Sequence, residues 1–213
     1  IGISAGVSYG ALGSTHHSLH DFAALRAIHN MTVVAPADNF ETRAVIKAAL
    51  SYPHPIYIRF GKKPLPDLYP PETTFEIGKA QIVRPGADLT FVATGETVAR
   101  SVQAAERLAA QGISARVLSM HTVKPLDTAA LLAAAEETDA IITVEEHSVF
   151  GGLGGACAEV LLQSGASIPF RIVGIPDEYT VTGSQDDIFT HYGITPAGLA
   201  ATAHELLPSA VAG

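Results

Sequence analysis

The sequence has little of what marks secreted, membrane or disulfide-stabilised proteins. It contains a single cysteine, Cys157, which excludes an internal disulfide and a multi-cysteine metal site. Cys157 lies in an apolar stretch, so we expect a buried, unreactive thiol in a reducing, cytoplasmic protein. The apolar runs are far too short to cross a bilayer, and we expect neither a signal peptide nor a membrane partner.

Basic residues are scarce as well. Lys and Arg number 13 against 21 Asp and Glu, which gives a formal net charge of −8. Nucleic-acid-binding proteins concentrate Lys and Arg on one face, and the only basic cluster in this sequence is Lys62-Lys63. We therefore expect no nucleic-acid partner. Hydrophobic residues make up 47% of the 213 residues, which is enough for a substantial buried core.

Short apolar runs alternate with helical patterns along most of the chain, as is typical of a parallel α/β sheet. The apolar runs predict strands at residues 32–34, 56–59, 80–83, 89–93, 115–118, 140–144 and 171–173. The helical patterns predict helices at residues 21–28, 38–50, 98–109, 127–135 and 155–162, and two more within 185–207. Asp38, followed three residues later by Glu41, is the clearest predicted helix start.

A proline-rich segment divides this pattern. Residues 62–71 contain four prolines, which neither a helix nor a central strand accommodates. We therefore predict a first unit at residues 1–61, a linker at 62–74 and a second unit at 75–213. In the second unit, right-handed crossovers would give a doubly wound, mostly parallel sheet of about five strands.

The most informative loop is at residues 10–21, where glycines and hydroxyls accompany His16, His17 and His20 just before a predicted helix. Free N–H groups at a helix start suit an anionic ligand, and histidine carries or transfers a proton near neutral pH. The alternative is an ordinary turn with exposed histidines. We do not expect a metal site, because no third ligand is evident.

Three other segments have both a functional and a structural interpretation. Arg59 could bind a phosphate or form a surface salt bridge, and neither is favoured. Residues 145–147, Glu-Glu-His, end a strand where ligands often bind, but we favour a subunit interface. The glycines of residues 151–155 match no phosphate-binding motif, so we expect them to allow close packing of a helix on a strand.

Residues 2–6 match G-x-S-x-G, the nucleophile-elbow pattern of serine hydrolases, with Ser4 as the candidate nucleophile. That motif requires a strand before it and a helix after it. Residues 7–10, Val-Ser-Tyr-Gly, predict no helix. A serine hydrolase is therefore a distant alternative.

Taken in order, these segments resemble the transketolase family. Residues 13–17 are similar to its G-P-T-H-[QHA] pattern, and residues 29–38 to P-N-M-x-V-x-x-P-A-D. Residues 57–61 resemble Y-I-R-x-G, and residues 122–127 resemble T-[IV]-K-P-[LI]-D. Residues 144–154 resemble V-E-E-H-x-x-x-G-G-L-G. The matches extend over almost all of the chain.

The resemblance implies a fold and a set of partners. Residues 1–61 would be the second half of a pyrimidine-binding domain, and residues 75–213 a transketolase C-terminal domain that builds a homodimer. An N-terminal subunit or module would hold the diphosphate and Mg²⁺ of thiamine diphosphate, because the sequence contains no G-D-G…N motif. The implied reaction is transfer of a two-carbon ketol unit between sugar phosphates. We expect this chain alone to be inactive.

The resemblance also implies site residues. His16 corresponds to a catalytic histidine that faces the donor sugar, and Arg59 to an arginine that binds the substrate phosphate; His17, in the same motif as His16, is predicted to contact substrate. No cofactor-binding residue is assigned. Ser14 replaces the usual proline, and Leu12 replaces an aspartate that reads donor hydroxyls.

These two departures keep other functions open. The chain could belong to a deoxyxylulose-phosphate synthase-like enzyme or act as a 2-oxo-acid dehydrogenase β-subunit-like component. It could also be a non-catalytic dimerisation module.

Overall fold

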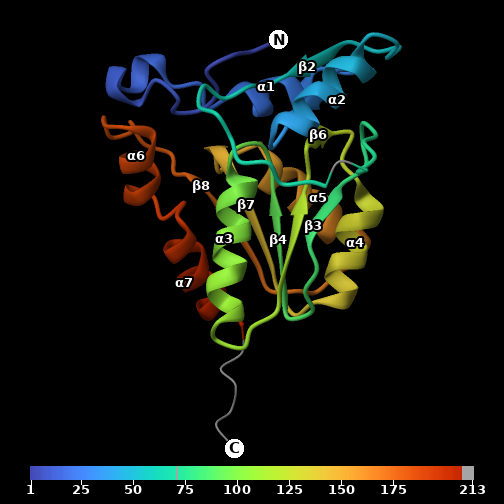
Figure 1. Ribbon diagram of the computed structural model, residues 1–213, viewed down its shortest axis with the longest axis vertical. Helices are drawn as coiled ribbons and strands as arrows, with labels where there is room; N and C mark the ends of the chain where they lie inside the picture. Colours follow the sequence, from blue (N-terminus) through green and yellow to red (C-terminus); the bar gives the residue numbers. More distant parts are fainter. Residues whose placement is uncertain (71, 208–213) are drawn as a thin grey trace, which may run out of the picture.

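The computed structural model describes residues 1–70 and 72–207, which form two α/β units arranged along the long axis (Figure 1). The first elements are η1 (Gly10–Leu12), η2 (Ser14–His16), α1 (Asp21–Ala27), β1 (Thr32–Val34), α2 (Asn39–Ala49) and β2 (Ile56–Ile58). They are followed by β3 (Gln81–Arg84), β4 (Leu89–Ala93), α3 (Thr97–Ala109), β5 (Ala115–Ser119), β6 (Thr122–Lys124) and α4 (Thr128–Glu137). The last are β7 (Ile141–Ser148), α5 (Leu153–Ser164), β8 (Phe170–Ile175), α6 (Gln185–His191) and α7 (Pro196–Leu206).

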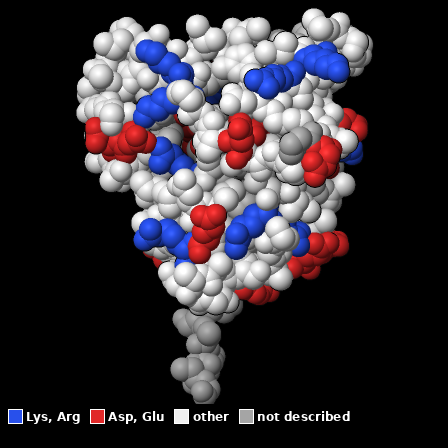
Figure 2. Space-filling view, in the orientation of Figure 1, with Lys and Arg blue, Asp and Glu red and all other residues white. Residues whose placement is uncertain are grey.

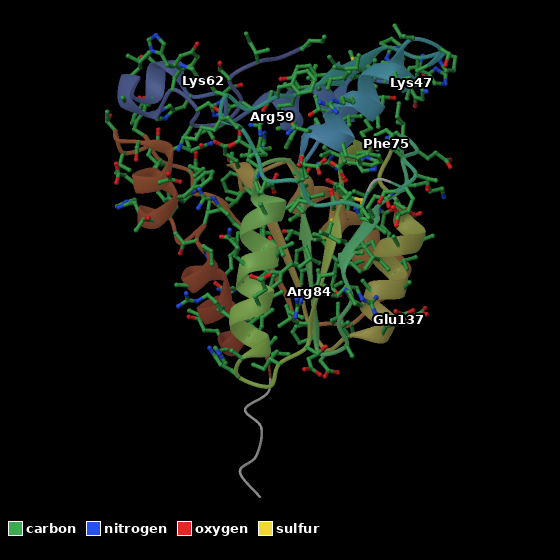
Figure 3. The ribbon with its side chains drawn as sticks, in the orientation of Figure 1. Lys47, Arg59, Lys62, Phe75, Arg84 and Glu137 are labelled. Atoms are coloured by element: carbon green, nitrogen blue, oxygen red, sulfur yellow. The ribbon has the colours of Figure 1, made fainter. Side chains whose placement is uncertain are left out.

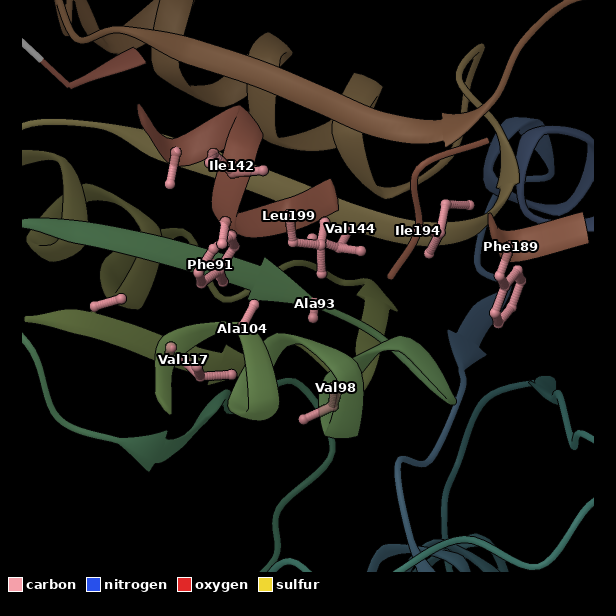
Figure 4. Close-up of a cluster of buried hydrophobic side chains, with 14 of the residues drawn as sticks. Phe91, Ala93, Val98, Ala104, Val117, Ile142, Val144, Phe189, Ile194 and Leu199 are labelled. Carbon is pink, nitrogen blue, oxygen red and sulfur yellow. The ribbon is translucent and has the colours of Figure 1, made fainter. Parts of the chain in front are cut away.

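The larger sheet has the strand order β3-β5-β4-β7-β8 and is parallel except for the edge strand β3, which confirms the mostly parallel five-stranded prediction. Its central strand β4 is buried on both faces because helices cover both. Phe91 and Ala93 pack with α3, α6 and α7 on one face (Figure 4). Val92 packs with α4 and α5 on the other, where Cys157 is buried as predicted.

The smaller sheet has the order β2-β1-β6. Residues of α1 pack on one face of it and residues of α2 on the other. The third strand, β6, comes from the second unit: Val34 pairs with Thr122 and Val33 with Lys124 in an antiparallel arrangement. The division at residues 62–74 stays a prediction, but the second unit supplies a strand to the first unit's sheet.

The start of α2 follows the predicted capping pattern in part. The Asp38 carboxylate accepts a hydrogen bond from the Glu41 backbone N–H at 2.8 Å, as predicted. The Glu41 carboxylate, however, accepts from the N–H of Ala37 at 2.6 Å and is completely buried. Among the described residues, no helix is long and apolar enough to span a membrane.

Candidate functional site

The histidine loop, residues 10–21, is held by backbone hydrogen bonds from both units. In the first unit, the N–H of Ser18 donates to the carbonyl of Gly6 at 2.8 Å. In the second, the N–H of Ser148, at the end of β7, donates to the carbonyl of Leu19 at 3.0 Å. The position of the loop therefore depends on both units folding together.

The two predicted histidines of this loop face different surroundings. His16 is exposed at the end of η2, and its Nδ1 lies 3.0 Å from the hydroxyl of Thr15. His17 is half-buried, with its Nδ1 hydrogen-bonded to the hydroxyl of Thr180. His20 lies just before α1, which begins at Asp21, so the histidines are not arranged on a helix face.

A cavity of about 660 Å³ separates this loop from residues 175–180. It lies at the carboxyl ends of β7 and β8, the edge where parallel sheets commonly bind ligands. Ser14, Thr15, His17 and His20 line one side, while Asp177 and Glu178 contribute carboxylates from the other. His16 and Arg59 do not line this cavity.

Arg59 is buried, with only 5% of its surface exposed, so the surface-salt-bridge alternative is wrong. Its Nε donates to Oδ2 of Asp21 at 2.8 Å, and its Nη2 donates to the carbonyls of Ser18 and Glu146 at 3.0 and 2.8 Å. Its guanidinium also lies over the ring of Phe22, 4.5 Å from the ring centroid. Arg59 therefore joins the histidine loop to the two units.

The prediction that residues 145–147 face another subunit is wrong. The exposed fractions of Glu145, Glu146 and His147 are 0%, 2% and 0% within one chain. Glu146 accepts a hydrogen bond from the Val7 N–H at 2.8 Å, and the His147 ring stacks on Phe22 at 5.0 Å. The segment packs between the two units of the same chain, because the first unit covers the carboxyl end of β7.

The adjacent glycines allow close packing, as predicted. A Cβ on Gly152 would overlap a carboxylate oxygen of Glu145, and one on Gly154 would lie 2.5 Å from Ile172. Glu145 accepts hydrogen bonds from the N–H groups of Leu153 and Gly154, at 2.7 and 2.8 Å, which are the free donors at the start of α5. The helix start thus binds a carboxylate of its own chain.

A buried carboxyl pair between the units was not predicted. The Gln185 amide donates to Glu96 at 2.7 Å and to Glu146 at 2.9 Å, and one oxygen of each carboxyl is buried without a hydrogen-bond partner in the described residues. Burial raises the pKa of Glu146 to about 7 and raises that of Glu96. No sequence motif connects the three residues, which are far apart in the chain.

Metal-ligating side chains are not clustered in the described residues. No group of three His, Cys, Asp or Glu side chains in residues 1–70 and 72–207 could hold a metal ion. The free N–H groups at the start of α5 are already occupied by Glu145. The exposed side chain of His16 and the hydroxyls of Ser14 and Thr15 are suited to contacting a group held by another protein surface.

Comparison with known proteins decides the family. Residues 1–67 match the model of the transketolase pyrimidine binding domain, and residues 78–199 match that of the transketolase C-terminal domain. The chain belongs to the transketolase family. Both matched segments contribute to the histidine loop and its supports.

Two relatives and one solved structure illustrate the similarity. The chain is 49% identical to a subunit of the apulose-4-phosphate transketolase of Phocaeicola vulgatus, over 97% of this chain and 66% of that protein. It is 39% identical to the 1-deoxy-D-xylulose-5-phosphate synthase of Heliobacterium modesticaldum, over 96% of this chain and 32% of that protein. A structure described as a split gene transketolase, inactive beta4 tetramer, is 38% identical with a TM-score of 0.86, over 96% of this chain and 65% of that one. This transketolase-family chain thus spans less than two thirds of the structure that it resembles.

Proposed function

We propose that this chain is the C-terminal component of a split, thiamine-diphosphate-dependent transketolase-like enzyme. In this proposal an N-terminal subunit completes the active site, and the assembly transfers a two-carbon ketol unit between sugar phosphates. The similarity to a subunit of an apulose-4-phosphate transketolase and to a split-gene transketolase supports it. The chain alone would be inactive.

The observation that carries the proposal is the attachment of the histidine loop to both units. Gly6 of the first unit and Ser148 of the second hold the loop through its backbone, and Arg59 holds it through Ser18. These contacts leave the His16 side chain exposed. An exposed imidazole on a fixed backbone suits proton transfer to a substrate bound between two subunits.

The partner subunit would hold Mg²⁺ and the diphosphate, because no group of His, Cys, Asp or Glu side chains in the described residues could hold the metal ion. When bound, thiamine diphosphate supplies an electron sink for cleavage of a carbon–carbon bond. His16 would face the donor sugar, and His17, fixed by Thr180, would contact substrate from the wall of the 660 Å³ cavity. Arg59 would bind a substrate phosphate through Nη1, which makes no hydrogen bond within the described residues.

The proposed assembly includes a homodimer formed through the second unit, in the cytoplasm. The tetrameric description of the similar split-gene structure supports self-association. Light scattering of the full-length protein alone tests this point: a dimer or a dimer of dimers is expected, and a monomer at micromolar concentration would overturn it.

The activity is tested by mixing the full-length protein with its separately purified N-terminal partner, thiamine diphosphate and Mg²⁺. Ketol transfer from a ketose phosphate to an aldose phosphate is expected only when both subunits are present. His16→Ala should lower kcat by about a hundredfold, whereas the exposed His29→Ala should leave kcat within about twofold. Absence of transfer over a panel of phosphorylated donors would reject the proposal.

The phosphate contact has a separate test. Arg59→Lys keeps a positive charge but loses the planar fork. The variant should raise KM about tenfold for a phosphorylated donor. KM for the same sugar without phosphate should rise less, because that sugar is affected only through the weakened loop contacts of Arg59. An equal change for both sugars would mean that Arg59 acts only through the loop.

The alternative is a deoxyxylulose-phosphate synthase-like component. The 39% identity to such a synthase supports this alternative, as do Leu12 and Ser14 in the histidine loop. Release of CO₂ from a 2-oxo-acid donor by the reconstituted pair would support it over ketol transfer. If neither reaction occurs with any partner that binds, a non-catalytic dimerisation role is the better interpretation.

A further inference from the structure

A second cavity lies on another side of the first unit. It is a groove of about 860 Å³ whose lining comes from α2 on one side and from Asp67, Tyr69, Pro70, Thr73 and Phe75 on the other. The groove shares no lining residue with the cavity beside His17. Figure 1 shows α2 on the side of the first unit opposite to η1 and η2. The groove is therefore separate from the proposed active site.

The two walls of the groove are fixed in place. The N–H of Leu68 donates to the buried Asp38 carboxylate at 2.9 Å, which anchors the linker at the start of α2. At the other end, the ring of Phe75 stacks on the buried ring of His121 at 4.4 Å. Tyr69, Pro70 and Thr73, which lie between these anchors in the sequence, line the groove opposite α2, so the groove is present before any ligand binds.

Two basic side chains of α2 line the groove. Arg43 and Lys47 are exposed, line the groove and lie one turn apart on α2. Neither forms an ion pair within the described residues. Figure 2 shows basic side chains over α2, and Figure 3 places Lys47 there. Like charges at this spacing repel each other, so an anion between them would stabilise the helix.

Acidic residues near the groove do not cancel this charge fully. Both oxygens of Asp38 accept backbone hydrogen bonds, from Glu41 and Leu68, and the residue is buried. Asp67, on the linker wall, is the exposed carboxylate, and the Asn39 amide donates to it at 3.4 Å. The exposed lining thus carries two positive charges and one negative charge, in a chain whose net charge is −8.

Three aromatic rings also line the groove. Phe40 and Tyr69 lie with their centroids 5.4 Å apart, one on each wall, and Phe75 also lines the groove. All three are only partly buried. Partly exposed aromatic rings, beside two cations without an ion-pair partner among the described residues, are complementary to a flat molecule that carries an anionic group.

We propose that this groove binds a small phosphorylated molecule with a planar ring, of the nucleoside monophosphate class. Its phosphate lies between Arg43 and Lys47, and its ring lies against Phe40 and Tyr69. A volume of 860 Å³ is sufficient for such a molecule.

Calorimetric titration of the full-length protein with AMP tests the proposal, with adenosine and inorganic phosphate as partial probes. AMP should bind more tightly than either partial probe. The double variant Arg43→Ala/Lys47→Ala should weaken AMP binding at least roughly tenfold. The control Lys79→Ala/Arg107→Ala removes two exposed positive charges outside the groove and should change AMP affinity by less than about twofold.

A further variant tests the ring contact. Phe40→Leu keeps an apolar side chain and removes the ring, so it should weaken AMP binding and leave phosphate binding unchanged. Circular dichroism confirms that each variant is folded. The proposal fails if AMP does not bind at millimolar concentration, if the groove and control variants bind it equally, or if either partial probe binds as tightly as AMP.

Discussion

Arg59 and Asp21 form a buried ion pair, with Nε of Arg59 2.8 Å from Oδ2 of Asp21, that joins the end of β2 to the first residue of α1. The side chains are only 5% and 11% exposed. Removing one partner leaves the other charge buried without compensation, which is costly. The pair also orients the Arg59 guanidinium that holds the histidine loop.

Asp21→Asn should therefore lower the free energy of unfolding by about 3–5 kcal/mol. Chemical denaturation of the full-length protein measures this. Lys63→Ala is the control, because the pair of Lys63 with Asp186 is exposed, 50% and 64%, and should contribute at most about 1 kcal/mol. Equal effects of the two substitutions would show that the buried pair stabilises the fold no more than an exposed pair does.

The carboxyl pair of Glu96 and Glu146 predicts a loss of stability as the pH rises. Burial raises both pKa values in the folded chain, that of Glu146 to about 7, above the ordinary carboxyl value of the unfolded chain. The folded state therefore retains protons that the unfolded state releases. The free energy of unfolding is unaffected below the carboxyl pKa of the unfolded chain. It falls as the pH rises from that value to about 7 and then levels off.

Glu146→Gln should make this decline shallower, and urea unfolding at a series of pH values measures it. Glu41 and Glu145, whose pKa values burial also raises to about 7, keep part of the slope. The exposed Glu205→Gln should leave the slope unchanged. If both variants follow the wild-type curve, the pair is already ionised in the folded chain.

His121 predicts the opposite dependence on the acid side. Burial lowers its pKa to about 4, so the folded chain resists a proton that the unfolded chain accepts near the ordinary histidine value. The stabilisation is therefore fully present above the pKa that His121 has in the unfolded chain. It is lost as the pH falls from that value toward 4. His121→Phe keeps a ring against Phe75 and should reduce that loss.

His147, whose pKa burial also lowers to about 4, should preserve some acid sensitivity in that variant. The surface substitution His29→Phe is the control and should leave the acid limb of the stability curve as it is. Thermal unfolding at pH values between the folded pKa of His121, about 4, and its ordinary value in the unfolded chain distinguishes the variants. An unaltered acid limb in His121→Phe would contradict the assignment.

Adjacent glycines at the start of α5 should respond in opposite directions to alanine. A Cβ on Gly154 would lie 2.5 Å from Ile172 and 2.8 Å from Thr143, so Gly154→Ala should cost about 1–3 kcal/mol. A Cβ on Gly155 would come no closer than 3.6 Å to Arg26, so Gly155→Ala should add up to about 1 kcal/mol through helix propensity. Denaturant midpoints of the two variants provide the comparison. A change of the same sign in both would reject the packing argument.

Much of the fold could be predicted because local pattern and burial agree. The continuous apolar run of β4 identifies a strand covered on both faces, and Asp38 marks the start of α2. The strand β6 was missed because three residues are too few for a periodic pattern to be recognised, and they pair only with β1. Short elements of this kind depend on tertiary partners rather than on local sequence.

The surroundings of the candidate site residues were less predictable. The charged side chains of Arg59 and Glu146 suggest surface positions, but the residues that bury them are distant in sequence: Arg59 contacts Glu146 across 87 positions. The motif that contains His16 and His17 indicated the loop, but not that His16 would be exposed while His17 lines a cavity. Only the packing of the two units determines which of them reaches solvent.

The contribution of β6, from the second unit, to the sheet of the first unit has a consequence for where the chain can be cut. A protease that cuts within residues 62–74 would leave β6 paired with β1, so the two fragments should remain associated and keep the histidine loop in place. If the two sides of the segment were synthesised separately, β1 would lack its partner β6 and leave an unpaired strand edge, which favours aggregation. The proline-rich segment is thus a position where the peptide can be cut after folding, but where separate synthesis would leave β1 without its partner.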